Sequence, residues 1–484
     1  MKKLLPLTAL ATSMAFANAA EITPFVTGGS DATQEDYKDY LVGFTVDGVA
    51  TCGGALINGK WILTAKHCTP IWYQTNGDLN ATVRVYQGLA AYDSEDLVYE
   101  GPAVSYREWN IADQHAYRED VSKYVVAPIL RELLKVDELD NYIEKFFNFG
   151  ESELYDDVVL IELSESIAHN DTVSLPTPKI LSEDFMPQTW EEFKASLNHD
   201  AGDEFTFMGW GLDREDGSTP ETLQKVKLTV KAPELDVDCY ITTNIYDEWE
   251  GTQHECDFDI NDPEHSYDRI SATYTIIADA FTTTRGVGAY TGTGPGDSGT
   301  GLFGPNGELY GVVSRGDIVP DDDGEYRTMF ASTLWYAQWF KEQINGLSTP
   351  SKLSAIEEEE GVHAPIFNVR VQNLSSDEQL IAPYLDDNEF FWIEENNCPS
   401  LLSGYESCEL TIGSNPNNEI LERGDAHSSS LSLNSESEIP VLIEVKGDDD
   451  NGTPPSNGSG KSGGSMSIMW LFGLMSVLWY RRRK

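Results

Sequence analysis

The stretch "TCGGALINGKWILTAKHC", residues 51–68, carries two short apolar runs, 55–57 and 61–63, on either side of Asn58 and Gly59. Asn-Gly readily adopts the positive φ angles of a two-residue hairpin turn, and the flanking runs have the length of short strands. The stretch therefore predicts a β-hairpin.

His67 comes just after the second of these runs, beside Cys68. A disulfide between Cys52 and Cys68 would tie down this end of the hairpin and fix the position of the histidine. A lone histidine is more often structural than catalytic, so its role depends on which other reactive residues the chain offers.

A second apolar run, "DDVVLIEL" at residues 156–163, is rich in β-branched residues and predicts a buried strand. An aspartate at the start of such a strand is costly to bury unless it is hydrogen-bonded, and a histidine Nδ1–H would satisfy it. Asp156 and Asp157 are both available, and Asp157 directly precedes the Val-Val-Leu-Ile run.

A third stretch, "GTGPGDSGTGLFGPNGELYGVVS" at residues 292–314, is rich in glycine and predicts a loop around Ser298. Taken alone, Ser298 is either a serine in a turn or a nucleophile, and the tetrapeptide Gly-Asp-Ser-Gly does not decide between the two. A histidine and an aspartate in suitable settings elsewhere favour the nucleophile.

Together these stretches resemble the trypsin-like serine proteases, which have the chymotrypsin fold. The matching segments follow the family's order of histidine, aspartate and serine over residues 26–347: "CGGALINGKWILTAKHC", "DVVLIEL", "MGWG" at 208–211, "LQKVKLTV" at 223–230, "GDSG" at 296–299 and "GVVSRG" at 311–316. The resemblance implies an all-β fold with two six-stranded antiparallel β-barrels. It also implies a serine-type endopeptidase that hydrolyses peptide bonds through an acyl-enzyme and needs no cofactor.

The resemblance implies a role for each candidate catalytic residue. Ser298 would attack the scissile carbonyl, His67 would act as general base, and Asp157 would hold the imidazole and stabilise its charged form. The backbone N–H groups of Gly296 and Ser298 would form the oxyanion hole. Ser314 would buttress the aspartate and line the substrate groove.

"FVTGGSDA", residues 25–32, resembles the activation junction of the family, with Val26 as the new N-terminus of a former zymogen. The family mechanism implies that the Val26 ammonium pairs with Asp297 and orders the oxyanion loop. Phe25 precedes the junction where the family usually has Arg or Lys, which indicates self-cleavage, another protease or a different processing site. A generic Gly-Gly turn is the alternative interpretation.

Substrate selection depends on residues near Ser298. By the family's spacing, Gly292 lies at the base of the primary pocket, and a neutral base favours apolar side chains. Ser314, Arg315 and Gly316 would line the groove. Arg315 stands where the family usually has Trp, so it would favour an acidic substrate residue or pair with a nearby carboxylate. The aspartates within 317–323 would alternatively restore an acidic pocket.

The composition and the N-terminus indicate an exported protein of several domains. The chain has 484 residues, enough for two or three domains, and its 32 basic and 81 acidic residues give a net charge of −49. That charge repels nucleic-acid phosphates, so nucleic-acid binding is excluded. Residues 1–19 combine a basic start, an apolar run and a small-residue cleavage site, which predict a signal peptide. Residues 20–25 would be a short propeptide.

Six cysteines fit an exported protein. Three disulfides between near neighbours are their simplest arrangement, namely Cys52 with Cys68, Cys239 with Cys256, and Cys398 with Cys408. No CxxC motif or Cys/His cluster indicates zinc, and no metal site is predicted.

The segment at about 106–150, between His67 and Asp157, is longer than the family needs. Its apolar residues recur at helical spacing with charged residues between them, which predicts a helical insertion in the protease domain 26–347. The insertion would be either a lid over the substrate groove or a decoration packed on the barrel.

The composition changes after residue 347. Residues 348–363 are expected to form a linker, and residues 364–446 contain short alternating stretches broken by Asn, Ser, Asp and Pro. This pattern predicts a small immunoglobulin-like (Ig-like) β-sandwich. Its role would be that of a spacer, an aid to secretion or a binding module.

The C-terminus is predicted to be a sorting signal. Residues 447–465 are a polar linker, and residues 466–484 are an apolar run, expected to form a short helix, that ends in Arg481-Arg482-Arg483-Lys484. With Gly463-Gly464 before it, the run resembles the GlyGly-CTERM signals of Gram-negative bacteria. That resemblance implies type II secretion, cleavage by a rhombosortase-like protease, attachment of a lipid and display on the outer-membrane surface or release from the cell. A plain membrane anchor is the alternative.

A rival function is that of a catalytically silent protein that keeps the protease fold for binding or adhesion. The presence of all three candidate catalytic residues, with Gly296 and Asp297, favours a peptidase acting on proteins or peptides.

Overall fold

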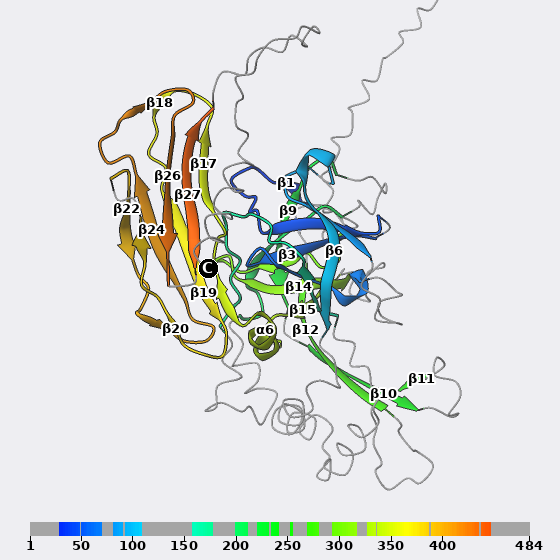
Figure 1. The fold of residues 1–484 in the computed structure, drawn as a ribbon. Helices are drawn as coiled ribbons and strands as arrows, with labels where there is room; N and C mark the ends of the chain where they lie inside the picture. The colour runs from blue at the N-terminus through cyan, green and yellow to red at the C-terminus, as the bar shows by residue number, and fades with distance from the viewer. Residues whose placement is uncertain are drawn as a thin grey trace, which may run out of the picture.

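The computed structural model is all-β, with one α-helix, α6 (Ala337–Ile344), among its described residues (Figure 1). The described residues are 29–48, 50–69, 81–90, 92–108, 157–177, 199–211, 220–231, 234–241, 252–254, 269–279, 293–316, 327–334, 336–386, 389–434 and 437–446. None of the helices among them is long and apolar enough to cross a membrane.

Six strands near the N-terminus close into an antiparallel barrel in the order β2-β3-β4-β7-β6-β5. Their bounds are β2 Leu41–Val46, β3 Ala50–Ile57, β4 Trp61–Thr64, β5 Thr82–Tyr86, β6 Leu97–Glu108 and β7 Val159–Leu163. One predicted six-stranded barrel is thus confirmed. The predicted hairpin is β3–β4, and its turn residues Asn58 and Gly59 have φ of 52° and 68°, as an Asn-Gly turn requires.

The short strand β1, which precedes the barrel, and the strands β8 to β15 form a nine-stranded sheet in the order β1-β9-β8-β13-β14-β15-β12-β10-β11. Their bounds are β1 Ser30–Asp31, β8 Glu204–Gly209, β9 Gln224–Val230, β10 Glu234–Ile241, β11 Thr252–His254, β12 Arg269–Asp279, β13 Gly301–Phe303, β14 Leu309–Gly316 and β15 Arg327–Ser332. β12 also pairs with β9, through Ala278 opposite Val230 and Asp279 opposite Thr229. The second barrel remains a prediction.

The first barrel and the nine-stranded sheet share one hydrophobic core. Buried side chains of the barrel, such as Phe44 and Leu63, belong to the same cluster as Met208 and Leu309 of the sheet. The barrel and the sheet are therefore packed against each other, and residues at their junction contact both.

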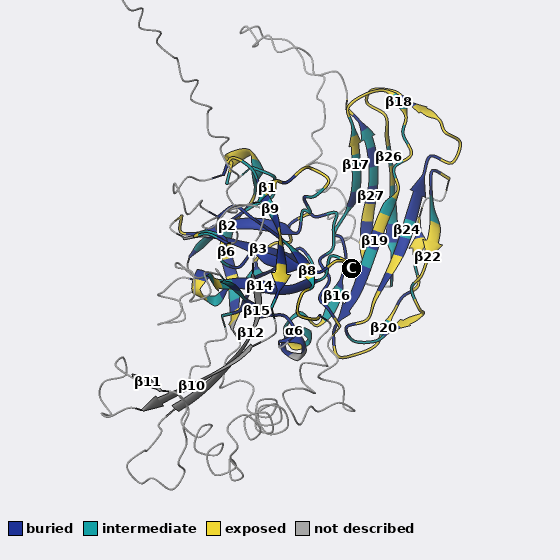
Figure 2. Ribbon diagram, turned by 180° about the vertical axis from the view of Figure 1, so that it is seen from behind, coloured by how far each residue is buried: buried dark blue, intermediate teal, exposed yellow. Residues whose placement is uncertain are grey.

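Residues 346–445 contain two four-stranded sheets, β16-β19-β24-β22 and β17-β27-β26-β21, which enclose a separate core (Figure 2). The bounds are β16 Gly346–Ser348, β17 Leu353–Glu357, β19 Phe367–Leu374, β21 Tyr384–Leu385, β22 Phe391–Asn396, β24 Ser407–Ser414, β26 Ala426–Ser432 and β27 Glu438–Val445. Two short pairs, β18 (Gly361–Val362) with β25 (Ile420–Leu421) and β20 (Gln379–Leu380) with β23 (Leu401–Leu402), accompany them. That this unit is Ig-like remains a prediction. Strands β17 and β18 lie within the segment expected to be a linker.

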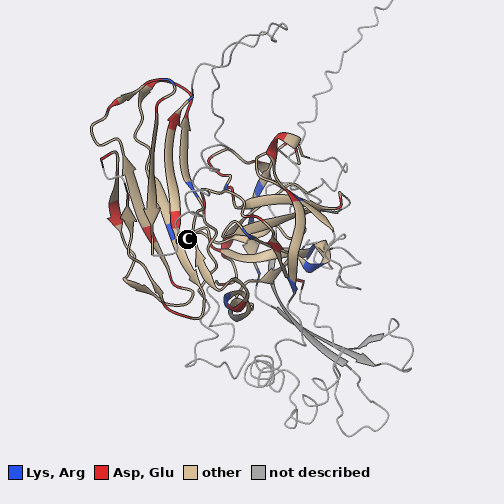
Figure 3. Cartoon of the chain, in the orientation of Figure 1, with Lys and Arg blue, Asp and Glu red and all other residues tan. Residues whose placement is uncertain are grey.

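Several predicted features lie outside the described residues. They are the signal peptide and propeptide, Val26, residues 109–150 of the expected helical insertion, Cys256, Gly292 and the C-terminal segment from residue 447. The first residues of the insertion, 106–108, continue strand β6 rather than forming a helix, because they pair with β7. Figure 3 shows Asp and Glu residues along the barrel and the nine-stranded sheet and also along the sheets of residues 346–445, in keeping with the charge of −49.

Candidate active site

His67 and Asp157 are brought together by the pairing of two barrel strands. β4 runs antiparallel to β7, with Thr64 opposite Val159. His67 lies in the short 3-10 turn that follows β4, and Asp157 comes two residues before β7. The end of one strand therefore meets the beginning of the other, although the two residues lie far apart in the sequence.

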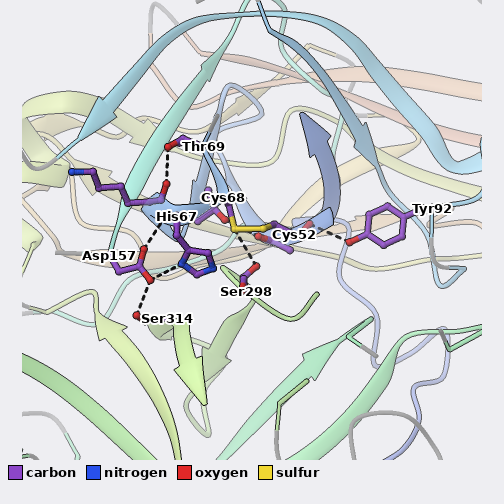
Figure 4. Close-up of a disulfide and its surroundings, with 11 residues drawn as sticks. Cys52, His67, Cys68, Thr69, Tyr92, Asp157, Ser298 and Ser314 are labelled. Atoms are coloured by element: carbon purple, nitrogen blue, oxygen red, sulfur yellow. Dashed lines mark hydrogen bonds and ion pairs between the residues drawn. A yellow bond between two sulfur atoms is a disulfide. The ribbon is translucent and has the colours of Figure 1, made fainter. Parts of the chain in front are cut away.

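The carboxylate of Asp157 accepts three hydrogen bonds (Figure 4). The backbone N–H of His67 lies 3.0 Å from Oδ1, the ring Nδ1 of His67 lies 2.8 Å from Oδ2, and the hydroxyl of Ser314 lies 2.7 Å from Oδ2. Because an ionised carboxylate only accepts hydrogen bonds, Nδ1 of His67 carries a proton. In the neutral ring, Nε2 is then left with a lone pair that can accept a proton.

The same contacts shift the pKa values of both partners. Burial lowers the pKa of His67, but the hydrogen bond and charge of Asp157 outweigh it, so the pKa is raised above 6.5. Burial raises the pKa of Asp157, but the hydrogen bonds from His67 and Ser314 outweigh it and hold the pKa below its usual value. The side chain of His67 is 47% exposed and that of Asp157 only 17%, so the imidazole is accessible while the carboxylate is shielded.

Ser298 lies in the glycine-rich loop before β13, next to the Cys52–Cys68 disulfide. Its carbonyl accepts a hydrogen bond of 2.9 Å from the N–H of Gly53 and lies 3.8 Å from Sγ of Cys68. Figure 4 shows Ser298 on the side of the His67 ring that faces away from Asp157. The three candidate catalytic residues are thus neighbours, with histidine between the other two.

The loop that carries Ser298 approaches the β3–β4 hairpin so closely that glycine is required on both sides. A Cβ atom on Gly299, whose φ is 78°, would collide with the hydroxyl of Thr64, and a Cβ on Gly53 would collide with the hydroxyl of Thr300. The Thr64 hydroxyl donates a hydrogen bond of 2.8 Å to the carbonyl of Gly53. Sequence reasoning missed the roles of Gly53 and Thr64, because only packing reveals them.

The candidate oxyanion-hole donors lie in the same loop. Gly296 has a φ of 99°, a conformation that favours glycine. Within the described part of the chain, neither the N–H of Gly296 nor that of Ser298 donates to a backbone carbonyl. Both donors are therefore free of such a bond and could serve a substrate oxygen.

Asp297 is fully buried behind this loop. Its Oδ1 accepts a hydrogen bond of 2.7 Å from the N–H of Gly211, and its Oδ2 accepts one of 2.7 Å from Gly294. A Cβ atom on Gly209 or Gly211 would collide with this carboxylate, which explains both glycines of the "MGWG" motif. Sequence reasoning gave this motif no role. The partner predicted for Asp297, Val26, lies outside the described residues.

The predicted groove residues lie at the end of β14. The pairing of β14 with β15 shifts between Val313 and Arg315, and this bulge inserts Ser314, whose hydroxyl points to the Asp157 carboxylate. Arg315 is exposed, and its Nε lies 3.0 Å from Sδ of Met329. Gly316, the last residue of β14, is half-buried. Gly292 lies outside the described residues.

Two predicted disulfides are confirmed, Cys52–Cys68 and Cys398–Cys408. The first joins β3 to the turn that carries His67, and the second joins β24 to the segment after β22. The third, Cys239 with Cys256, remains a prediction. The described residues contain no cluster of three or more His, Cys, Asp or Glu residues that could hold a metal ion.

Comparison with known proteins gives a family and several similar structures. A family model described as Trypsin matches residues 26–99 and 115–340. The chain is 15% identical to the VesB protease of Vibrio cholerae, over 87% of this chain and 100% of that one, with a TM-score of 0.34. The chain is 16% identical to the secreted serine protease VesC of the same organism, over 86% of this chain and 71% of that one, with a TM-score of 0.33. It is also 16% identical to human heparin binding protein, over 66% of this chain and 96% of that one, with a TM-score of 0.36.

Proposed function

Because this chain belongs to the trypsin family of serine proteases, we propose that it is a serine endopeptidase whose catalytic triad is His67, Asp157 and Ser298. The observation that carries the proposal is the hydrogen bonding of the Asp157 carboxylate to the ring and the backbone of His67, with Ser298 on the other side of the ring. This is the arrangement in which an aspartate orients a general base toward a serine.

The proposed reaction proceeds through an acyl-enzyme. The Ser298 hydroxyl attacks the scissile carbonyl carbon while Nε2 of His67 takes its proton, and Asp157 stabilises the imidazolium. The N–H groups of Gly296 and Ser298 donate to the oxyanion of the tetrahedral intermediate. His67 returns the proton to the leaving amine. A water then attacks the ester while His67 takes its proton, and His67 passes that proton to Ser298 as the acid product leaves.

The groove is proposed to be lined by Ser314, Arg315 and Gly316, with Gly292 at the base of its primary pocket. The exposure of Arg315 and the position of the β14 bulge beside the carboxylate of Asp157 support the first part of this assignment. The substrates are proposed to be proteins or peptides.

We further propose that the chain is made as a zymogen and activated by a cut before Val26. In the mature protein the Val26 ammonium would pair with Asp297. The complete burial of Asp297 directly before Ser298 supports this role, since a buried carboxylate needs strong partners. The hydrogen bond from Gly211, which follows β8, links Asp297 to the neighbouring sheet, and the hydrogen bond from Gly294 lies within the loop itself.

Export and display are proposed from the ends of the sequence. Residues 1–19 would direct secretion, residues 20–25 would form the propeptide, and the protease domain would be residues 26–347. The second domain, 364–446, would be followed by the polar linker and a GlyGly-CTERM tail at 466–484. The tail would be removed by a rhombosortase-like protease after type II secretion, leaving the enzyme on the cell surface or in the medium.

A fluorophosphonate probe tests the proposed nucleophile directly. Purified protein is incubated with the probe, and its intact mass is compared with that of the Ser298→Ala variant. The proposal predicts one adduct on the wild-type chain beginning at Val26 and none on the variant. A chain that begins at Val26 and forms no adduct would instead favour the silent binding protein.

A further inference from the structure

Tyr92 contacts the candidate active site from behind, on the side of the Cys52–Cys68 disulfide away from His67 (Figure 4). We propose that Tyr92 is a positioning residue: its phenol holds the peptide group between Cys52 and Gly53, and that peptide holds the carbonyl of Ser298. The inference rests on the proposed function, in which Ser298 is the nucleophile.

The proposal follows from a chain of two hydrogen bonds through one peptide group. The Tyr92 hydroxyl donates to the carbonyl of Cys52 at 3.3 Å. The N–H of the same peptide, which belongs to Gly53, donates to the carbonyl of Ser298 at 2.9 Å. Donation to the carbonyl of a peptide polarises its N–H and strengthens the next hydrogen bond. The phenol therefore acts on the nucleophile loop without touching it.

The ring of Tyr92 is held in place by two neighbours on the barrel. It packs against the backbone of Gly43, where a Cβ atom would come within 2.9 Å of the ring carbon Cε1. Tyr86 packs against it edge-on, with ring centroids 5.5 Å apart and ring planes 78° apart. Gly43 lies directly opposite Gly53 in the β2–β3 pair, so the side chain spans the two strands at the required position.

The backbone of Tyr92 adopts a conformation that a bulky residue rarely takes. Its φ is 56°, in the left-handed region. Such strain persists only where the surroundings determine it, and here Leu89, three residues earlier, anchors the segment. The carbonyl of Leu89 accepts hydrogen bonds from Trp210 Nε1 at 3.1 Å and from the N–H of Leu223 at 2.7 Å. The segment therefore joins the barrel to the nine-stranded sheet.

The surroundings also keep the phenol a donor. Burial raises the pKa of Tyr92, and the negative charge of Asp297 raises it further. The hydroxyl thus stays protonated over the whole range in which a histidine base would work.

The test compares Tyr92→Phe with the matched control Tyr86→Phe, which removes the hydroxyl of the adjacent ring. Loss of one hydrogen bond predicts a kcat about two- to tenfold lower for Tyr92→Phe, with KM and melting temperature nearly unchanged. The rate of fluorophosphonate labelling should fall by the same factor. Amide hydrogen exchange at Gly53 in the full chain should become faster by a similar factor, and Tyr86→Phe should match the wild type in all measurements.

Two outcomes would overturn the proposal. One is a Tyr92→Phe variant whose kcat and Gly53 exchange equal those of the wild type. The other is a loss of melting temperature and a rise in KM that Tyr86→Phe shares, which would indicate ordinary packing. If even the wild type neither hydrolyses peptides nor labels at Ser298, the proposed function fails, and exchange at Gly53 alone then decides whether Tyr92 controls this peptide.

Discussion

Three donors converge on the carboxylate of Asp157, and they determine which nitrogen of His67 bears the proton. Two come from His67 and the third from Ser314, which the bulge in β14 turns toward the carboxylate. The carboxylate is shielded and cannot donate when ionised, so it holds the ring in one tautomer and one orientation. A substitution at residue 157 that can donate as well as accept should change both the tautomer and the orientation of the His67 ring.

Asp157→Asn makes that substitution without a change of size. An amide NH₂ facing Nδ1 would favour the tautomer with its proton on Nε2, so kcat should fall by about 10⁴-fold, as such a change does in a Ser-His-Asp triad. Steady-state kinetics on a peptide substrate measure it, with Asp171→Asn, in the segment that follows β7, as the control. A loss of less than tenfold would show that Asp157 does not orient the base.

The wild-type enzyme should lose activity as the pH falls through the pKa of His67. The base must be unprotonated to accept the proton of Ser298, and the hydrogen bond and charge of Asp157 raise the pKa of His67 despite burial. The acidic limb of kcat/KM against pH is therefore expected to have its midpoint above 6.5. A midpoint well below 6.5 would contradict the account.

At the scale of elements, the loop that carries Ser298 is held by the β3–β4 hairpin in addition to its own hydrogen bonds. Gly299 and Gly53 allow the two to touch, and the N–H of Gly53 donates to the carbonyl of Ser298. Activity and local stability should therefore depend on the absence of side chains at this contact.

Gly53→Ala tests this contact. The added methyl group would collide with the hydroxyl of Thr300, so the free energy of unfolding should fall by about 1–3 kcal/mol, with a loss of activity. Denaturant unfolding measures it. Gly346→Ala is the control, because the nearest atom to its Cβ lies 3.8 Å away. Its free energy of unfolding and activity should stay close to those of the wild type. Equal effects of the two variants would refute the proposed close contact.

Much of this arrangement could be predicted from local patterns, and the rest could not. The Asn58-Gly59 turn and the strand after Asp157 follow from propensity and apolar periodicity, and their order matched the family. The contacts of Gly53 with Thr300 and of Gly211 with Asp297 join segments far apart in the chain, so no local pattern contains them. Residues 106–108, which the sequence assigned to the start of the insertion, instead extend β6 by pairing with β7, a partner more than 50 residues away that no local pattern indicates.

His199 offers a second test at this scale. Its ring packs edge-on against Phe205 and Tyr310, the residue is 5% exposed, and among the described residues neither ring nitrogen has a hydrogen-bond partner. Burial lowers its pKa below 6.5, although Asp203 and Asp200 act against it. The unfolded chain therefore binds more protons, and stability should fall as the pH drops below about 6.5, by at most about 1.4 kcal/mol per pH unit.

The variant His199→Phe keeps a ring in this site and removes the titration. Its free energy of unfolding, measured by denaturant between pH 5 and pH 7, should depend less on pH than that of the wild type. An unchanged pH dependence would show that His199 does not contribute.

At the scale of the whole molecule, the two four-stranded sheets of residues 346–445 are joined to the preceding part of the chain by polar contacts. The side-chain amide of Gln372, 1% exposed, binds both backbone groups of Leu175, at 2.8 Å and 2.7 Å. The hydroxyl of Tyr405 donates to the carbonyl of Ala337 at 2.8 Å, and Asn170 accepts from Ser354. Tyr405 also belongs to the hydrophobic core that contains the barrel, so the contact includes apolar packing as well as hydrogen bonds.

The two parts should therefore unfold as one unit. Gln372→Ala would leave the N–H and C=O of Leu175 without these partners, which should cost about 2–4 kcal/mol of unfolding free energy. Calorimetry of the wild type should show a single transition, lowered in the variant, with Gln379→Ala as the control. Two separate transitions in the wild type, unmoved by Gln372→Ala, would show that the second domain is an independent spacer.

The central claim is that His67 and Ser298 act as one catalytic unit, and a double-mutant cycle tests it most directly. The measurement is kcat for hydrolysis of one peptide by the wild type, His67→Ala, Ser298→Ala and the double variant. Residues that act as a unit are strongly non-additive, so the double variant should retain the same residual rate as each single variant. Single losses that multiply in the double variant, or a His67→Ala enzyme that keeps its activity, would contradict the triad.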